Sequence, residues 1–362
     1  MSTLQHLRKF GQSLWLDSIS RQMLDDGRLQ RYAGELEVTG LTSNPTIFDE
    51  AIGSGAYDEE IARQSRAGKS GEALFIELAL DDLRRAAELF RPAFERTEGV
   101  DGWVSMEVSP LLAADTSGSV RAAANIHRAA NLANLFVKIP GTPEGVPAIE
   151  QSIFDGVPIN VTLLFSPQQY LASANAYLRG IERRIAAGRS PRVPSVASLF
   201  VSRWDKAVAG KVPAELQNRL GIAIALRTYV AYLELHASPR WQRLASAGAR
   251  PQRMLWASTG TKDPKLAESW YAEAFAAPDT IDTLPEKTLL ALSKIDALPP
   301  PMPTDGGDSA HTLAEFARAG VDADALALQL QREGAEAFVK SWGNLMSRIG
   351  ERGSGADRRA SA

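Results

Sequence analysis

One stretch of the sequence, residues 134–145, constrains the fold and the chemistry of the chain more than any other. It reads Asn-Leu-Phe-Val-Lys-Ile-Pro-Gly-Thr-Pro-Glu-Gly. The apolar run around Lys138 predicts a buried strand, which Pro140 and Gly141 end. Burial penalises a charged ammonium and makes the neutral amine, the form that attacks a carbonyl carbon, accessible. Lys138 is therefore either a Schiff-base nucleophile or a buried lysine that extends its ammonium to a salt-bridge partner.

Strand-like and helix-like segments alternate along the rest of the chain. Short apolar segments bounded by turn residues predict eight strands, and most of the connections between them read as helices. Alternation of this kind predicts a parallel sheet, and eight repeats favour an α/β fold closed into a (β/α)8 TIM barrel over an open sheet. The predicted strands are 13–18, 36–45 with its turn, 103–108, 135–139, 159–165, 193–201, 254–260 and 280–285.

Both ends of the chain extend beyond the eight repeats. A short polar helix precedes the first strand, and a Pro-rich linker at 298–308 leads to a helical segment at about 309–348. We expect this segment to pack on the barrel or over its mouth, and 352–362 to form a disordered tail. We therefore predict a single barrel domain, 1–362, with additional N- and C-terminal helices. Other predicted helices include two within 58–96, divided near 68–70, and those at 115–133, 144–155 and 214–235.

The composition excludes several classes of site. There is no cysteine, which excludes disulfides, zinc–thiolate sites and cysteine nucleophiles. The four histidines do not pair at metal-ligand spacing, so no metal site is predicted. A formal net charge of −3 argues against nucleic acid and acidic membranes as partners. We find no signal segment and no apolar run of the roughly 20 residues that a membrane span needs, so we expect a cytoplasmic protein.

Polar residues gather at the C-terminal ends of the predicted strands. These ends meet at one face of a parallel barrel, where active sites lie. A lysine flanked by two carboxylates and several hydroxyl or amide groups suits Schiff-base chemistry, in which acids and bases move protons on and off the adduct. Taken singly, Asp17 reads as a helix N-cap and Asn44 as a turn residue before proline. The set comprises Asp17, Asn44, Glu107, Lys138, Thr162, Ser198 and Ser258.

A phosphate site is indicated beside the last strands. Arg203 follows the sixth strand and Lys262 follows the seventh, close to Ser258 and a Thr-Gly-Thr turn. Small residues beside a cation in a late barrel loop suit phosphate binding. The spacing alone is equally compatible with ordinary loop charges.

Two local motifs resemble those of the transaldolase family. The first is Thr-Ser-Asn-Pro at 42–45, and the second is the lysine segment 135–145. Supporting matches lie at 160–166, 198–203 and 256–258. The resemblance runs in consistent order over about residues 11–345.

This resemblance implies a (β/α)8 barrel that transfers a dihydroxyacetone unit in the pentose phosphate pathway. The donor would be sedoheptulose 7-phosphate and the acceptor glyceraldehyde 3-phosphate, giving erythrose 4-phosphate and fructose 6-phosphate. Sugar phosphates are then the partners, and neither a metal nor an organic cofactor is implied. The sequence leaves both a monomer and a homodimer open.

The resemblance also implies a role for each matching residue. Lys138 would form the Schiff base with the ketose, and Asp17 would take the C4 hydroxyl proton. Glu107 and Thr162 would hold the water that shuttles protons. The remaining positions would bind substrate: Asn44 and Asn160 the dihydroxyacetone hydroxyls, Thr42, Ser198 and Phe200 the walls of the site, and Arg203 and Ser258 the phosphate.

The sequence departs from the family pattern at the phosphate site. Many relatives carry a second arginine two positions after the serine matched by Ser258, and here that position is Gly260. Lys262 is the candidate for the missing charge, as a point cation without bidentate geometry. Leu199 stands where many relatives have proline, with no clear functional consequence.

Three rival functions are consistent with parts of the pattern. The nearest is an aldolase similar to fructose-6-phosphate aldolase, which releases free dihydroxyacetone. A glycosidase barrel would use Asp17 and Glu107 on a sugar, but it leaves Lys138 without a role. A catalytically inactive binding barrel would not require the lysine and both acids together.

Overall fold

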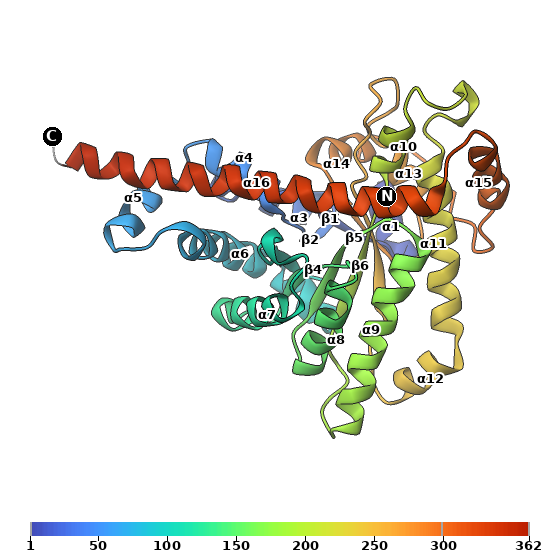
Figure 1. Ribbon diagram of the computed structural model, residues 1–362, viewed down its shortest axis with the longest axis horizontal. Coiled ribbons are helices and arrows are strands. Elements are labelled where there is room, and N and C mark those ends of the chain that lie inside the picture. The colour runs from blue at the N-terminus through green and yellow to red at the C-terminus, as the bar shows by residue number, and fades with distance from the viewer. Residues whose placement is uncertain (1, 298–299, 361–362) are drawn as a thin grey trace.

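Eight parallel strands form the centre of the molecule (Figure 1). The computed structural model describes residues 2–297 and 300–360, and within them the strands lie in the order β2-β1-β8-β7-β6-β5-β4-β3. Surrounding helices complete an α/β barrel, so the predicted (β/α)8 fold is confirmed. The strands are β1 (Ser13–Leu16), β2 (Val38–Leu41), β3 (Val104–Glu107), β4 (Leu135–Pro140), β5 (Ile159–Leu164), β6 (Ser195–Phe200), β7 (Gln252–Ala257) and β8 (Ile281–Leu284).

The ring closes between β2 and β3 through isolated hydrogen bonds. The Leu41 amide donates to the Trp103 carbonyl at 2.9 Å, and Ser43 Oγ donates to the Ser105 carbonyl at 2.7 Å. Gly40 permits this approach because a Cβ atom at that position would lie only 2.6 Å from the Trp103 carbonyl oxygen. A residue without a side chain therefore lets the two strands meet.

Helices fill most of the connections between the strands, as the alternating pattern predicts. No helix in the described part of the chain is both long enough and apolar enough to cross a membrane. The helices up to β8 and just beyond are α1 (Thr3–Phe10), α2 (Arg21–Asp25), α3 (Arg28–Glu35), α4 (Pro45–Gly53), α5 (Asp58–Arg66), α6 (Gly71–Arg96), α7 (Thr116–Ala130), α8 (Gly145–Asp155), α9 (Pro167–Ala186), α10 (Ser202–Val208), α11 (Leu220–Ala237), α12 (Pro239–Ser246), α13 (Trp270–Ala274) and α14 (Glu286–Leu292).

The N-terminal end of the barrel interior is filled. Trp15 and Phe136 are fully buried there, and Trp103 stacks on Phe136 with 4.1 Å between ring centroids. Beside them the Asp101 carboxylate accepts hydrogen bonds from Trp15 Nε1 at 2.8 Å and from Thr39 Oγ1 at 2.7 Å. Large rings and a hydrogen-bonded carboxylate therefore occupy this end of the barrel interior.

The segment after β8 folds back across the barrel. Its helices are α15 (Ser309–Arg318) and α16 (Ala323–Ala360), and α16 runs across the molecule toward α4 and α5 (Figure 1). Trp342 packs edge-on against Phe75 of α6, with ring centroids 5.1 Å apart. Gln331 Nε2 donates to the carbonyls of Gly141 and Leu163, just beyond β4 and near the end of β5. The C-terminal segment therefore packs both on the barrel and at its mouth.

Three sequence predictions either differ from the structure or fall partly outside the described residues. The predicted disordered tail is helical as far as Ala360, and residues 361–362 lie outside the described residues. Of the Pro-rich linker 298–308, residues 298–299 also lie outside them, and 300–308 contain no helix or strand. The helix predicted at 214–235 starts only at Leu220, because Asn218 has a φ of 61° and interrupts the helical path.

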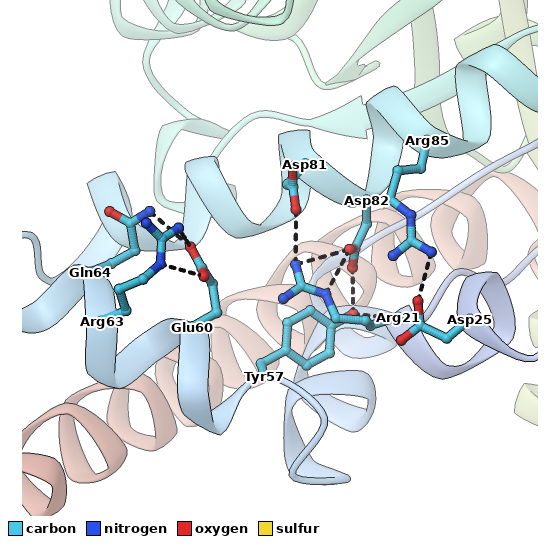
Figure 2. Close-up of polar contacts among 9 residues, drawn as sticks. All are labelled: Arg21, Asp25, Tyr57, Glu60, Arg63, Gln64, Asp81, Asp82 and Arg85. Atoms are coloured by element: carbon cyan, nitrogen blue, oxygen red, sulfur yellow. Dashed lines mark hydrogen bonds and ion pairs between the residues drawn. The ribbon is translucent and has the colours of Figure 1, made fainter.

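A polar cluster fixes the segment that follows β1 (Figure 2). Tyr57 OH donates to the buried carboxylate of Asp82 at 2.6 Å and accepts from the Arg21 amide at 3.0 Å. The Arg21 side chain donates to Asp82 Oδ1 at 3.1 Å, and its guanidinium carbon lies 4.6 Å from the Tyr57 ring centroid. These contacts hold the start of α2 against α5 and α6, and thereby fix the loop that carries Asp17.

We predict that Gly40→Ala weakens the closure of the barrel. The added Cβ would lie 2.6 Å from the Trp103 carbonyl and 2.8 Å from the Trp15 indole, so the free energy of unfolding should fall by about 1–3 kcal/mol. Urea denaturation measures this change. The matched control is Gly34→Ala in α3, where the new methyl meets nothing within 4 Å. Equal stability of the two variants would show that Gly40 is not needed for closure.

Candidate functional site

A cavity of about 330 Å³ opens at the C-terminal ends of the strands. Ten of the twelve predicted site residues line it; the other two, Glu107 and Asn160, lie buried beside Lys138 in the strands. A larger hollow of about 900 Å³ lies on the outside, between α5, α6 and α7, and contains none of the predicted residues. The ten that line the cavity are Asp17, Thr42, Asn44, Lys138, Thr162, Ser198, Phe200, Arg203, Ser258 and Lys262.

Lys138 lies at the floor of the cavity in a row of three polar side chains. The parallel ladder pairs it with Glu107 of β3 on one side and with Asn160 of β5 on the other. Lys138 is only 4% exposed, and its Nζ lies 3.3 Å from Glu107 Oε2. Nζ also donates to the Ser43 carbonyl at 2.9 Å. The surroundings of Lys138 fit both interpretations of this residue. The amine has an acidic partner, as a buried structural lysine needs, and it faces a cavity, as a nucleophile needs.

The carboxyl groups beside Lys138 are held in a poorly solvated setting. Burial raises the pKa of Glu107, while the charge of Lys138 acts in the opposite direction. Burial likewise raises the pKa of Asp17, and Lys138 and the Thr42 hydrogen bond partly offset it. Groups with raised pKa values bind and release protons closer to neutrality than free carboxylates do. The arrangement can therefore carry out general acid–base chemistry around an amine.

Asp17 is placed by the barrel and by a hydroxyl chain, and it does not cap a helix. Its Oδ1 accepts from Thr42 Oγ1 at 2.8 Å, and Thr42 Oγ1 lies 2.7 Å from the hydroxyl of Thr283. The N-cap of α2 is Ser20, whose hydroxyl accepts from the Met23 amide. The carboxylate of Asp17 is therefore oriented into the cavity by the ends of β1, β2 and β8.

Hydrogen bonds also orient the amides and hydroxyls of the opposite wall. Ser198 Oγ donates to Asn160 Oδ1 at 2.7 Å, and Asn160 Nδ2 donates to Ser105 Oγ at 3.2 Å. Thr162 is fully buried, and its hydroxyl has no hydrogen-bond partner among the described residues. Asn44 caps α4, because its Oδ1 accepts a hydrogen bond from the Ile47 amide at 3.0 Å. This agrees with the predicted turn role and leaves the side-chain amide nitrogen able to donate to a ligand.

A cationic corner lies at the side of the cavity formed after β6 and β7. Burial lowers the pKa of the Arg203 guanidinium, opposed chiefly by the charge of Glu107. Ser258 adopts a φ of 55°, and its hydroxyl lies 3.0 Å from that of Ser202. A Cβ atom at Gly260 would lie 3.9 Å from Lys262 Nζ. The lysine thus reaches back to the space beside Gly260.

Several residues of the site were not predicted from the sequence. Ser43 supplies the carbonyl that Lys138 contacts, a backbone role that no side-chain motif reveals. Thr283 of β8 follows the same rule as the residues that were predicted, since it lies near the C-terminal end of a strand. Phe338 belongs to α16. The only related prediction was that the C-terminal helical segment packs on the barrel or over its mouth. The unpredicted lining residues are Thr46, Ile47, Glu50, Ala257, Gly260, Thr283, Pro285 and Phe338.

We predict that Lys138→Met makes stability strongly dependent on pH. The variant leaves Glu107 as an unpaired buried acid, which costs about 3 kcal/mol when it is charged. A carboxyl group with a raised folded-state pKa contributes stability that is present below its unfolded pKa and lost as pH rises through the folded pKa. The variant should therefore be much less stable at about pH 8 than at about pH 5, as measured by urea denaturation.

The double variant Lys138→Met/Glu107→Gln is the control for this prediction. It removes the titrating group at the same site, so the additional loss of stability between the two pH values should disappear. If the single and double variants respond to pH alike, Glu107 is not the buried acid that the lysine compensates.

Comparison with known proteins places the chain in one family. The family model described as Transaldolase/Fructose-6-phosphate aldolase matches residues 14–349. A protein named Transaldolase from Thiobacillus denitrificans is 42% identical over 97% of this chain and its own full length. Another from Thermobifida fusca is 41% identical over 97% of this chain and 98% of its length, and Transaldolase 2 of a Nostoc species is 36% identical over 96% of each. The chain therefore belongs to the transaldolase/fructose-6-phosphate aldolase family.

Proposed function

We propose that this chain, an enzyme of the transaldolase class, transfers a dihydroxyacetone unit from sedoheptulose 7-phosphate to glyceraldehyde 3-phosphate. The products are erythrose 4-phosphate and fructose 6-phosphate, and the reaction belongs to the non-oxidative pentose phosphate pathway of the cytoplasm. The observation that carries this proposal is the position of Lys138 on the cavity floor, 3.3 Å from Glu107 and on the same cavity as Asp17. The names of the relatives favour transfer over simple cleavage.

Lys138 forms the Schiff base with the donor ketose. Its neutral amine attacks C2, the former carbonyl oxygen takes up two protons, one of them from the attacking amine, and its loss as water leaves a protonated imine. Glu107 and Thr162 hold the water that carries these protons. Both are buried. Glu107 Oε2 lies 3.3 Å from Lys138 Nζ, and Thr162 Oγ1 has no hydrogen-bond partner among the described residues, which supports a role for the two side chains in binding a shared water.

Asp17 then breaks the carbon chain of the donor. Its carboxylate takes the proton of the C4 hydroxyl, the C3–C4 bond breaks, and the aldose leaves with a new carbonyl group. The electron pair of the broken bond moves into the iminium and gives an enamine on Lys138. The enamine carbon attacks the carbonyl of the second aldose, Asp17 returns the proton to its oxygen, and hydrolysis of the new imine restores the lysine.

The remaining polar residues bind the sugar. Asn44 and Asn160 bind the retained dihydroxyacetone hydroxyls through their amide groups, and Thr42 and Ser198 line the same part of the site. The hydrogen bonds already made by these side chains support this role, because they fix each group before substrate arrives. Phe200 forms the pocket wall beside them.

Arg203, Ser258 and Lys262 bind the phosphate group at the cationic corner. Arg203 offers a planar donor fork, and Lys262 supplies a second positive charge where Gly260 has no side chain. The left-handed backbone at Ser258 supports this assignment, since strained backbone at a functional site is maintained by its surroundings.

The test of the proposed function is trapping of the covalent adduct. Incubation with fructose 6-phosphate and borohydride should reduce the imine and add the mass of the reduced dihydroxyacetone unit or ketose to Lys138, as read by peptide mass spectrometry. Lys138→Met is the control, and it should neither trap substrate nor turn over. Modification at another lysine, or full activity of Lys138→Met, refutes the mechanism.

The requirement for an acceptor separates transfer from the aldolase alternative. Release of glyceraldehyde 3-phosphate from fructose 6-phosphate should be fast only when erythrose 4-phosphate is present to accept the three-carbon unit. Equal rates of ketose cleavage with and without the acceptor would instead identify an enzyme that releases free dihydroxyacetone.

We predict that phosphate affinity depends on the protonation of Lys262. Desolvation lowers the pKa of this lysine, and the positive charges of Lys287, Arg203 and Lys206 lower it further. Its charge is therefore lost at a lower pH than that of a free lysine, which titrates near about 10.4. The KM for fructose 6-phosphate should rise as the pH approaches that value from neutrality.

Lys262→Arg is the matched variant, because arginine keeps its charge throughout this range. Its KM for fructose 6-phosphate should change less with pH than that of the wild type. Dividing one KM by the other removes the pH dependence of imine formation, which the two enzymes share. A constant ratio from neutral to alkaline pH would remove Lys262 from the phosphate site.

A further inference from the structure

The C-terminal helix α16 reaches the cationic corner of the cavity. Phe338 of this helix lines the cavity, far along the chain from the strands that supply the other walls. The guanidinium carbon of Arg203 lies 5.2 Å from the ring centroid of Phe200 and 5.8 Å from that of Phe338. Arg203 therefore contacts two aromatic rings, one from the barrel and one from α16.

A glycine one turn before Phe338 makes room for the same arginine. Gly334 is buried in the middle of α16, where glycine is an unfavourable helix residue. A Cβ atom there would lie 3.0 Å from Arg203 Nη1 and 2.9 Å from Leu163 Cδ2. The guanidinium thus lies against the backbone surface of the helix, and a methyl group at 334 would have to displace it.

The helix is held firmly enough to act as a support. Gln331, one turn before Gly334, donates to two carbonyls at the barrel mouth at 2.9 and 3.0 Å. One turn after Phe338, Trp342 packs edge-on against Phe75, and Ser341 Oγ lies 2.8 Å from Thr46 Oγ1 of α4. Contacts on both sides of Phe338 therefore fix the register of α16 relative to Arg203.

This mode of support leaves Arg203 free to bind an anion. Among the described residues, the Arg203 side chain forms neither a salt bridge nor a hydrogen bond, and the charges of Glu107, Glu333 and Asp17 act on it only from a longer distance. Aromatic faces stabilise a cation without using its N–H donors. A salt bridge would orient the arginine equally well, but it would occupy those donors and cancel the charge.

We infer that Phe338 and Gly334 of α16 are positioning residues that hold Arg203 for the phosphate group of the aldose. In this way the C-terminal helix sets the preference of the enzyme for phosphorylated over unphosphorylated aldehydes. The inference rests on the proposed function, in which Arg203 binds phosphate. Neither residue takes part in proton transfer, so their effect is on the recognition of phosphate.

The test compares two acceptors that differ only in the phosphate group, glyceraldehyde 3-phosphate and glyceraldehyde. The measured quantity is the ratio of kcat/KM for the phosphorylated acceptor to that for the unphosphorylated one, with sedoheptulose 7-phosphate as donor and release of erythrose 4-phosphate as the readout. Phe338→Leu removes one ring, and Gly334→Ala displaces the guanidinium. Each should lower the ratio by roughly three- to tenfold, the range expected for a lost cation–π contact.

Thermal melts of both variants separate positioning from stability. Phe338→Leu reduces packing, whereas Gly334→Ala raises helix propensity but places a methyl group 2.9 Å from Leu163 Cδ2. An unchanged kcat/KM for glyceraldehyde in each variant shows that the catalytic site is intact. Gly343→Ala is the matched control in the same helix, since its methyl meets nothing within 4 Å, and its ratio should equal that of the wild type.

Arg203→Ala distinguishes failure of this inference from failure of the proposed function. If Arg203→Ala lowers the ratio but Phe338→Leu and Gly334→Ala leave it unchanged, α16 does not position the arginine and the inference is overturned. If Arg203→Ala itself leaves the ratio unchanged, the phosphate site lies elsewhere and the proposed role of Arg203 is overturned as well.

Discussion

The parallel ladder of β3, β4 and β5 is the constraint on which the site depends. It sets Glu107, Lys138 and Asn160 side by side, so that a buried amine has a carboxyl on one flank and an amide on the other. Without the carboxyl, the cost of burying the ammonium would fall on the fold. Without the cavity above it, the lysine would be only structural. The same register that pairs these three strands therefore creates the reactive group.

The fold and the floor of the site were predictable because both follow from local pattern. Apolar runs ended by Pro, Gly or Asn mark the strands, and polar residues at strand ends meet at one face of a barrel. Phe338 and Gly334 carry no such signal, because their importance arises only when α16 crosses the barrel mouth. The helix predicted at 214–235 began too early for a related reason. Its true start is fixed by the distant Asp205, which accepts hydrogen bonds from the amides of Leu220 and Gly221.

At the cationic corner, the second positive charge comes from position 262 and not from position 260. Gly260 has no side chain, and Lys262 places its ammonium near the space that a side chain there would enter. Arg203 is supported by aromatic rings, whereas Lys138 is supported by a carboxyl. The difference suits their proposed tasks, since an anion-binding arginine needs free donors and a Schiff-base lysine needs a nearby proton acceptor.

The closure between β2 and β3 has a consequence for the motions of the barrel. Most neighbouring strands share a ladder, but this seam is held by the amide of Leu41 and the hydroxyl of Ser43. Local opening of a ring begins where its hydrogen bonds are fewest. Ser43 also supplies the carbonyl that contacts Lys138, so an opening of the seam would move this acceptor away from the amine. We therefore expect local opening of the barrel to change the position of the Lys138 amine through Ser43.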